Sequence, residues 1–211
     1  MAKRLWRLLF SRWRAWSLFF KALTRHSLFY PLAKVSVGGT ITIGRRATLK
    51  KVLLDAGTGL ITVGDGVWAN DGVELSASRK IVLGPGTTLQ RNVTINGDVV
   101  VGAGCLFGPN VFVSSSSHVH DQYPGITIRE QERRISRDDF LALYDKPIII
   151  GDDVWLGVNS VLMPGISVGS HAIIGANAVV TRSVPQGAIV AGSPAKLIKF
   201  RLGFEGVQHV E

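Results

Sequence analysis

The feature that most constrains the fold is an apolar residue that recurs at every sixth position from residue 43 onward. The first positions of successive hexads are Ile43, Leu49, Asp55, Val63, Ala69, Leu75, Leu83, Leu89, Ile95, Val101, Phe107, Val113, Ile150, Leu156, Leu162, Val168, Ile174 and Val180. Seventeen of these 18 residues are apolar, whereas a chain that is 46% apolar would give about eight. The frame contains slips of two residues before 63 and before 83. Because six is not a helical period, the repeat predicts short strands.

A glycine recurs at one phase of this repeat, after every third hexad. It follows the first position of each of six triplets, at Gly44, Gly64, Gly84, Gly102, Gly151 and Gly169. A glycine at one fixed phase predicts a corner at which φ is positive or two backbone segments approach closely. Three hexads per turn therefore predict an all-β fold, a parallel β-helix of about six triangular coils. The two ends of such a stack need caps, and residues 1–34 and 196–211 are the candidates.

The positive charge is concentrated at the N-terminus. The chain has a formal net charge of +9, and residues 1–34 hold eight basic side chains and no acidic one. Since the whole chain has 24 basic and 15 acidic residues, residues 35–211 carry 16 basic and 15 acidic ones, a net charge of +1. A nearly neutral body lacks the basic stripe that a nucleic-acid-binding surface requires. We therefore expect no nucleic-acid partner.

Residues 1–34 also have the periodicity of an amphipathic helix. One face carries Arg4, Arg7, Ser11, Arg14, Lys21 and Arg25, and the opposite face carries Leu5, Leu9, Trp16, Phe20 and Leu23. A basic helix with Trp, Phe and Leu on one side is typical of peripheral membrane contact, and packing within an oligomer is the alternative. Arginines at 12 and 14 interrupt any apolar signal-peptide core. No apolar run is long enough to predict a spanning helix.

Four segments resemble the hexapeptide-repeat acyltransferases. They read KPIIIGDDVWLG from residue 146, MPGISVG from 163, IGANAVVTR from 174 and AGSPAK from 191. The galactoside and maltose O-acetyltransferases and the sugar O-acetyltransferases of bacterial surface polysaccharides are most similar. The resemblance implies a left-handed β-helix over residues 35–195, a homotrimer with active sites between neighbouring subunits, and acetyl-CoA as the acyl donor.

A loop insertion at residues 114–149 interrupts the repeat, and long loops inside a regular scaffold are usually functional. It begins with four serines followed by His118-Val-His120-Asp121. His118 matches the catalytic position of the family, and an imidazole can take a proton from a hydroxyl near neutral pH. The resemblance implies direct acetyl transfer with His118 as general base. Backbone N–H groups of residues 156–158 would hold the oxyanion. His120 is the alternative base.

The resemblance also assigns residues to the cofactor and the acceptor. The cofactor residues would be Trp155, Gly157 and Ala176 along the pantetheine arm, and Thr181, Arg182, Lys196 and Lys199 at the nucleotide phosphates. The candidates for acceptor binding are Asn92, His120 and Asp121. The single cysteine, Cys105, falls on an inward phase of its hexad, so we expect it to be buried rather than nucleophilic.

The acceptor and the reaction leave alternatives open. An N-acetyltransferase of an amino sugar or another small acceptor is compatible with the same fold. A γ-class carbonic anhydrase needs three zinc-binding histidines, two of them five residues apart, whereas His118 and His120 are two apart; we therefore expect no metal. An inactive scaffold is disfavoured because the catalytic histidine is present. The basic N-terminus differs from that of the galactoside type, which favours a lipid-linked sugar acceptor at the cytoplasmic face of the inner membrane.

Overall fold

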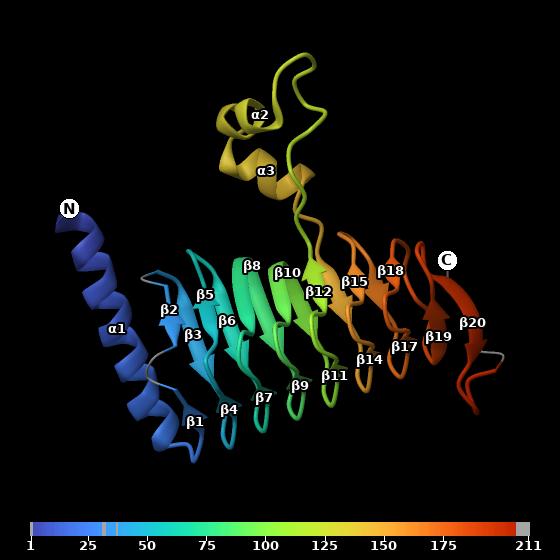
Figure 1. Cartoon of the computed structure of the whole chain (residues 1–211), viewed down its shortest axis with the longest axis horizontal. Coiled ribbons are helices and arrows are strands. Elements are labelled where there is room, and N and C mark those ends of the chain that lie inside the picture. Colours follow the sequence, from blue (N-terminus) through green and yellow to red (C-terminus); the bar gives the residue numbers. More distant parts are fainter. Residues whose placement is uncertain (1, 31–32, 37, 206–211) are drawn as a thin grey trace.

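A computed structural model describes residues 2–30, 33–36 and 38–205, so residues 206–211 of the expected C-terminal cap lie outside the described residues. The body is a parallel β-solenoid of about eight turns with three faces (Figure 1). The first face holds β1 (Leu28–Phe29), β4 (Thr48–Leu49), β7 (Trp68–Ala69), β9 (Thr88–Leu89), β11 (Leu106–Phe107), β14 (Trp155–Leu156), β17 (Ile173–Ile174), β19 (Ala188–Ala191) and β20 (Lys196–Phe200).

The other two faces of the solenoid are joined by two long strands that belong to both. The second face holds β2 (Lys34–Val35), β5 (Leu53–Asp55), β12 (Phe112–Ser114), β15 (Val161–Leu162) and β18 (Val179–Val180). The third face holds β3 (Thr40–Ile43), β6 (Leu60–Val63), β13 (Ile148–Ile150) and β16 (Ser167–Val168). Strands β8 (Glu74–Leu83) and β10 (Thr94–Val101) run round the corner and contribute to both.

The parallel solenoid is confirmed, but the expected number of six coils was wrong. One extra turn begins with β1 and β2, inside the segment that the charge pattern assigned to the N-terminal helix. Another contains β19, which follows the last hexad of the frame. The two-residue slips in the hexad frame arise because the early coils are longer than three hexads. Leu49 pairs with Ala69, and Ala69 with Leu89, so each of these coils takes 20 residues. Later coils, such as that from Leu156 to Ile174, take 18.

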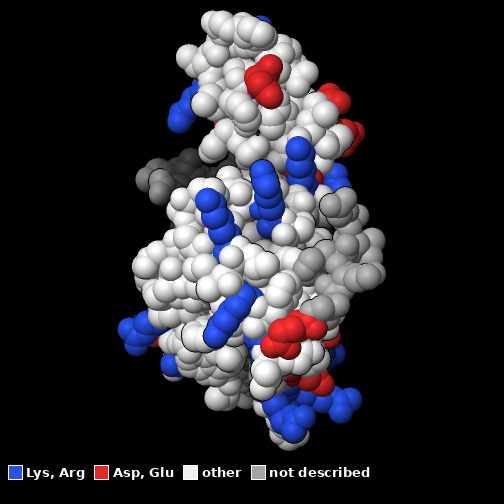
Figure 2. Space-filling model, turned by 90° about the vertical axis from the view of Figure 1, so that its right-hand side faces the viewer, with Lys and Arg blue, Asp and Glu red and all other residues white. Residues whose placement is uncertain are grey.

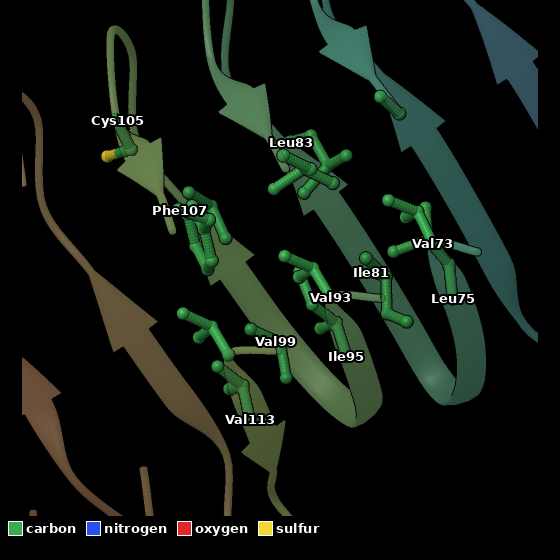
Figure 3. Packing of buried hydrophobic residues seen from close by; sticks show 14 of the residues in the cluster. Val73, Leu75, Ile81, Leu83, Val93, Ile95, Val99, Cys105, Phe107 and Val113 are labelled. Atoms are coloured by element: carbon green, nitrogen blue, oxygen red, sulfur yellow. The ribbon is translucent and has the colours of Figure 1, made fainter. Parts of the chain in front are cut away.

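The core is a column of side chains stacked from coil to coil. All 17 apolar residues at the first hexad positions are buried, whereas Asp55 is exposed and Leu54 takes its place inside. Figure 3 shows this stacking, with Leu75 and Ile95 from neighbouring coils and Phe107 among them. Burying one such side chain contributes about 1.5–3 kcal/mol, so the repeated interior drives the fold.

The recurrent glycines are required by close approach of successive coils. A Cβ atom at Gly84 would lie 2.4 Å from the carbonyl carbon of Gly102, and one at Gly102 would lie 2.6 Å from that of Gly151. None of the six has a positive φ; that conformation occurs two residues later, at positions such as Arg46 and His171. Of the two reasons that the sequence left open, close packing of the backbone is the one observed.

A ladder of asparagines forms the corner between the first and second faces. Asn92, Asn110, Asn159 and Asn177 all have φ near +58°, a conformation that asparagine tolerates better than most residues. Each side-chain amide donates to the next carbonyl oxygen along the ladder, at 3.0–3.1 Å. The ladder therefore fixes this corner over four successive coils.

Helix α1 (Ala2–Leu23) covers the N-terminal end of the solenoid (Figure 1). Ala15, Leu18 and Ala22 are buried against the first turn. The guanidinium of Arg14 donates hydrogen bonds to the carbonyl oxygens of Ser36 and Gly38, at 2.6 and 2.7 Å. These bonds satisfy backbone acceptors at the open edge of the first coil. Over the described residues, none of the helices has both the length and the apolar character needed to cross a membrane.

The C-terminal end is closed by the antiparallel pair β19 and β20. Beyond it, Arg201 donates to the Asp153 carboxylate at 3.0 Å, and Phe204 packs on His171 with ring centroids 5.0 Å apart. Hydrogen bonds from His171 and then from Arg201 lower the pKa of Asp153 from its ordinary value. His171 therefore ties the tail to a corner of the solenoid.

Candidate functional site

The insertion leaves the solenoid after β12 and returns at β13, and both of these strands pair with β10. It rises from the flank of the solenoid and carries two short helices, α2 (Ile128–Arg134) and α3 (Arg137–Leu143) (Figure 1). The side chains of Thr127 and Ser136 accept N–H bonds at the two N-caps, as expected for helix starts of the form S/T-x-x-D/E.

A buried carboxylate anchors the base of the insertion. Asp145 is 2% exposed, and it accepts hydrogen bonds from the hydroxyl of Ser78, at 2.5 Å, and from that of Ser115. Beside it, burial raises the pKa of Asp98, which is also buried. Arg79 donates to the carbonyl oxygen of Leu141 at 2.8 Å and holds α3 to the solenoid. These contacts fix the insertion relative to the coils.

A cavity of about 860 Å³ lies between the insertion and the second face. It is lined by Asn96, Phe112, Ser114, Ser116, Ser117, His118, Glu132, Ile135, Ser136, Arg137, Phe140, Leu162, Met163 and Pro164. The lining therefore combines hydroxyl and charged groups with apolar side chains, which suits a sugar or another polar small molecule.

His118 lies in this cavity and forms a pair with Glu132 of α2. Its Nδ1 atom is 2.5 Å from the carboxylate oxygen Oε1, and the His118 side chain is 81% exposed. A carboxylate at Nδ1 fixes the tautomer that has its proton on Nδ1, which leaves Nε2 free to accept a proton. The sequence did not identify Glu132, because it lies 14 residues away in a stretch of mixed charge with no diagnostic spacing.

The other two residues of the His118-Val-His120-Asp121 segment make contacts within the insertion. The Nδ1 atom of His120 is 2.9 Å from the carbonyl oxygen of His118. The carboxylate of Asp121 accepts a hydrogen bond from the Tyr144 hydroxyl, which lowers the pKa of Asp121 and raises that of Tyr144 to about 12. The Asp121 carboxylate therefore contacts a tyrosine of the insertion. Neither residue lines the cavity.

The residues expected to bind the cofactor lie on another part of the solenoid. Trp155 is half exposed on the first face, and Gly157 follows it at the corner, where a Cβ atom would lie 2.6 Å from the amide nitrogen of Ala176. The N–H of Gly157 donates to the carbonyl oxygen of Ile174 at 2.8 Å. Asn92 belongs to the corner ladder. None of these residues lines the cavity that contains His118.

The expected phosphate-binding residues lie near the C-terminal end. Thr181, Arg182, Lys196 and Lys199 are all exposed. Figure 2, which views this end, shows several Lys and Arg side chains on the surface. Within the described residues, the three basic members make no ion pair. Their charge is therefore available to an anionic ligand.

Cys105 is fully buried, and burial raises the pKa of its thiol, as expected for a core residue. Over the described residues, the structure holds no group of three or more His, Cys, Asp or Glu side chains that could bind a metal ion together.

Comparisons with known proteins identify the repeat. Residues 80–115 match the family described as bacterial transferase hexapeptide (six repeats), and residues 147–182 match the hexapeptide repeat of succinyl-transferase. Galactoside O-acetyltransferase of Escherichia coli (strain K12) is 32% identical over 141 residues, which are 65% of this chain and 63% of that protein. The 2,3,4,5-tetrahydropyridine-2,6-dicarboxylate N-acetyltransferase of Staphylococcus aureus (strain JH9) is 57% identical over 53 residues, 25% of this chain and 22% of that protein.

This chain therefore spans less than two thirds of the length of these relatives. Among solved structures, a mutant of AntD, an N-acyltransferase from Bacillus cereus in complex with dTDP and coenzyme A, superposes with a TM-score of 0.57 at 17% identity. The match covers 86% of this chain and 89% of that one, and it supports the fold alone. The repeat matches, the galactoside O-acetyltransferase relative and the solenoid agree: residues 80–115 and 147–182 carry the hexapeptide repeat of bacterial transferases, and the chain is similar to the acetyltransferases built on it.

Proposed function

We propose that the protein transfers an acetyl group from acetyl-CoA to a sugar hydroxyl, in the synthesis of a bacterial surface polysaccharide or a lipid-linked oligosaccharide. The observation that carries the proposal is the His118–Glu132 pair in a polar and apolar cavity of about 860 Å³. The galactoside O-acetyltransferase relative supports the reaction class. The proposed place of work is the cytoplasmic face of the inner membrane, where acetyl-CoA and lipid-linked sugars meet.

In the proposed mechanism, the acceptor hydroxyl attacks the thioester carbonyl while Nε2 of His118 takes its proton. The resulting oxyanion needs N–H donors, and the N–H of Gly157 is already bonded to Ile174. We therefore assign the donor role to the amide of Val158, the next residue of the same corner. The tetrahedral intermediate then expels the CoA thiolate, which receives the proton from the imidazolium, and the acetyl ester is released.

The homotrimer and the left-handed coil that the family implies belong to the same proposal. The His118 cavity lies over the second face, whereas Trp155 lies on the first face and Lys196 near the C-terminal end. Because none of the proposed cofactor residues lines the cavity, we infer that one chain alone does not form the complete site. A neighbouring subunit that packs its first face against the cavity completes the site, with Gly157, Ala176, Thr181, Arg182 and Lys199 as further cofactor contacts.

Glu132 is assigned as the residue that positions His118. Glu132→Gln is expected to lower kcat about tenfold, because the amide no longer holds the imidazole in one tautomer by a charged hydrogen bond. Glu132→Asp should restore part of the rate, while the melting temperature of both variants stays near that of the wild type. Glu130→Gln is the matched control on the same helix, since the ion pairs of Glu130 among the described residues are with Arg133 and Arg134 and not with His118. Equal losses in the Glu130 and Glu132 variants would show a general effect of the helix.

The activity is tested by thiol release from acetyl-CoA with a panel of acceptors. We expect release with sugars that carry free hydroxyls, including a lipid-linked sugar, and little release with water alone. Mild base then distinguishes the products, because it cleaves an O-acetyl ester and leaves an N-acetyl amide intact. The 57% match to an N-acetyltransferase makes amine acetylation the second candidate. A base-stable product formed only with amino sugars would establish it in place of the first.

A further inference from the structure

We propose that α1 docks the protein on the surface of an anionic phospholipid bilayer, through the side of the helix that faces away from the solenoid. That outer face carries Trp6, Leu9, Trp13, Trp16, Phe20 and Leu23. These side chains are between 45% and 63% exposed, and their spacings of three and four residues align them in one stripe along the helix. This binding does not depend on the proposed acetyl transfer.

The structure separates this stripe from the side of the helix that the chain uses for its own folding. Ala15 and Leu18 are buried against the first turn, and Arg14 and Ser11 donate hydrogen bonds to carbonyl oxygens there. Arg25 likewise donates to the carbonyl oxygen of Ile43 at 2.7 Å. Ser11, Arg14 and Arg25 of the basic face therefore cap the solenoid. The aromatic face, which capping leaves exposed, is the part available to another surface.

The charged residues beside this stripe indicate which kind of surface binds it. Arg12 and Lys21 are exposed and border the stripe on its two sides, and residues 1–34 contain no acidic side chain. A second copy of the helix would bring like charges face to face with no carboxylate to neutralise them. An anionic bilayer instead attracts the cations while its interface accepts Trp, Phe and Leu. The lipid surface is therefore the occupant that matches both the apolar and the charged groups.

This orientation has a consequence for the reach of the site. Figure 1 shows α1 across one end of the solenoid and the insertion on its flank. On the second face β12 is the fourth strand after β2, so at about 4.8 Å per strand it lies about 19 Å further along the solenoid axis. If the proposed function holds, an acceptor sugar carried some distance from its lipid anchor would reach the cavity.

The test is flotation of the full-length protein with vesicles. Wild-type protein is expected to float with vesicles of phosphatidylcholine and phosphatidylglycerol, and much less with phosphatidylcholine alone. The double variant Trp13→Ser, Phe20→Ser should bind the mixed vesicles at least about tenfold more weakly, because it removes two aromatic side chains from the interface. Arg12→Gln with Lys21→Gln should bring binding to the mixed vesicles close to that of neutral ones.

Leu202→Ser is the matched control, since Leu202 is 94% exposed beyond β20 at the other end of the solenoid, and its variant should float like the wild type. The melting temperature and acetyl transfer to a water-soluble sugar should be unchanged in all variants, so a failure of docking and a failure of the proposed function are distinguishable. Wild-type protein that stays unbound to the mixed vesicles overturns the proposal. An aromatic double variant that floats normally also overturns it. So does a double variant whose mass in solution falls below that of the wild type, because the stripe would then join copies of the chain.

Discussion

His118→Ala is expected to lower kcat/KM for acetyl transfer by about 10²- to 10⁴-fold, the usual contribution of a positioned general base. The imidazole lies in the cavity, and its Nδ1 is held by Glu132, so Nε2 is the proton acceptor that the variant loses. Because the side chain is 81% exposed, its removal should leave the melting temperature almost unchanged. Thiol release from acetyl-CoA, measured with the best acceptor of the panel, gives the rate.

His120→Ala is the control for this prediction, because it removes a second exposed imidazole two residues away. Its ring contacts the backbone of His118 and lies near Tyr144, outside the cavity lining. We expect a loss of a few-fold at most from a small shift of the segment. A variant pair with the opposite behaviour, in which His118→Ala keeps its activity and His120→Ala loses it, would transfer the role of base to His120.

Phe107→Ala is expected to give the largest loss of stability, about 3–5 kcal/mol in the free energy of unfolding. Phe107 is 1% exposed at the centre of the stacked core, where it lies between the coils of Leu89 and Leu156. Truncation leaves a cavity that the rigid coils above and below cannot fill. For a chain of this length the loss corresponds to a fall of roughly 10 °C in the melting temperature, measurable by circular dichroism.

Leu106→Ala provides the comparison on the same strand, since successive side chains of a strand point to opposite faces. Leu106 is 51% exposed, and its truncation should change the stability of an isolated chain by about 0.5 kcal/mol or less. A fall in melting temperature equal to that of Phe107→Ala would show that Leu106 is covered in the assembled protein. The proposed homotrimer could cause this, since there the first face packs against a neighbouring subunit.

The sequence predicted the solenoid because its main determinant is local and periodic. Each apolar hexad position, from Ile43 to Val180, is buried for the same reason, and one coil predicts the next. The count of coils failed at the ends, where β1 and β19 lie outside the regular frame. A signal for one corner was present but unused, since asparagine recurs at 92, 110, 159 and 177.

The candidate site was predicted only in part because its geometry depends on contacts across the insertion. His118 could be proposed from its match to a family position, whereas Glu132 reaches it through the fold of α2. The anchor formed by Asp145 and Ser78 joins residues 67 positions apart, and no spacing rule connects them. Whether His118, Asn92 or the cationic residues bind substrates stays a prediction that the variants above can test.

The return of the chain to the coil that it left, with β12 and β13 both paired to β10, has an evolutionary consequence. The segment between these strands can be lengthened, shortened or exchanged while the pairing partners of every coil stay the same. Mutations that change which acceptor enters the cavity are therefore largely uncoupled from those that decide whether the chain folds. Descendants of such a scaffold can diversify in substrate choice by altering one loop, at little risk to the architecture that they inherit.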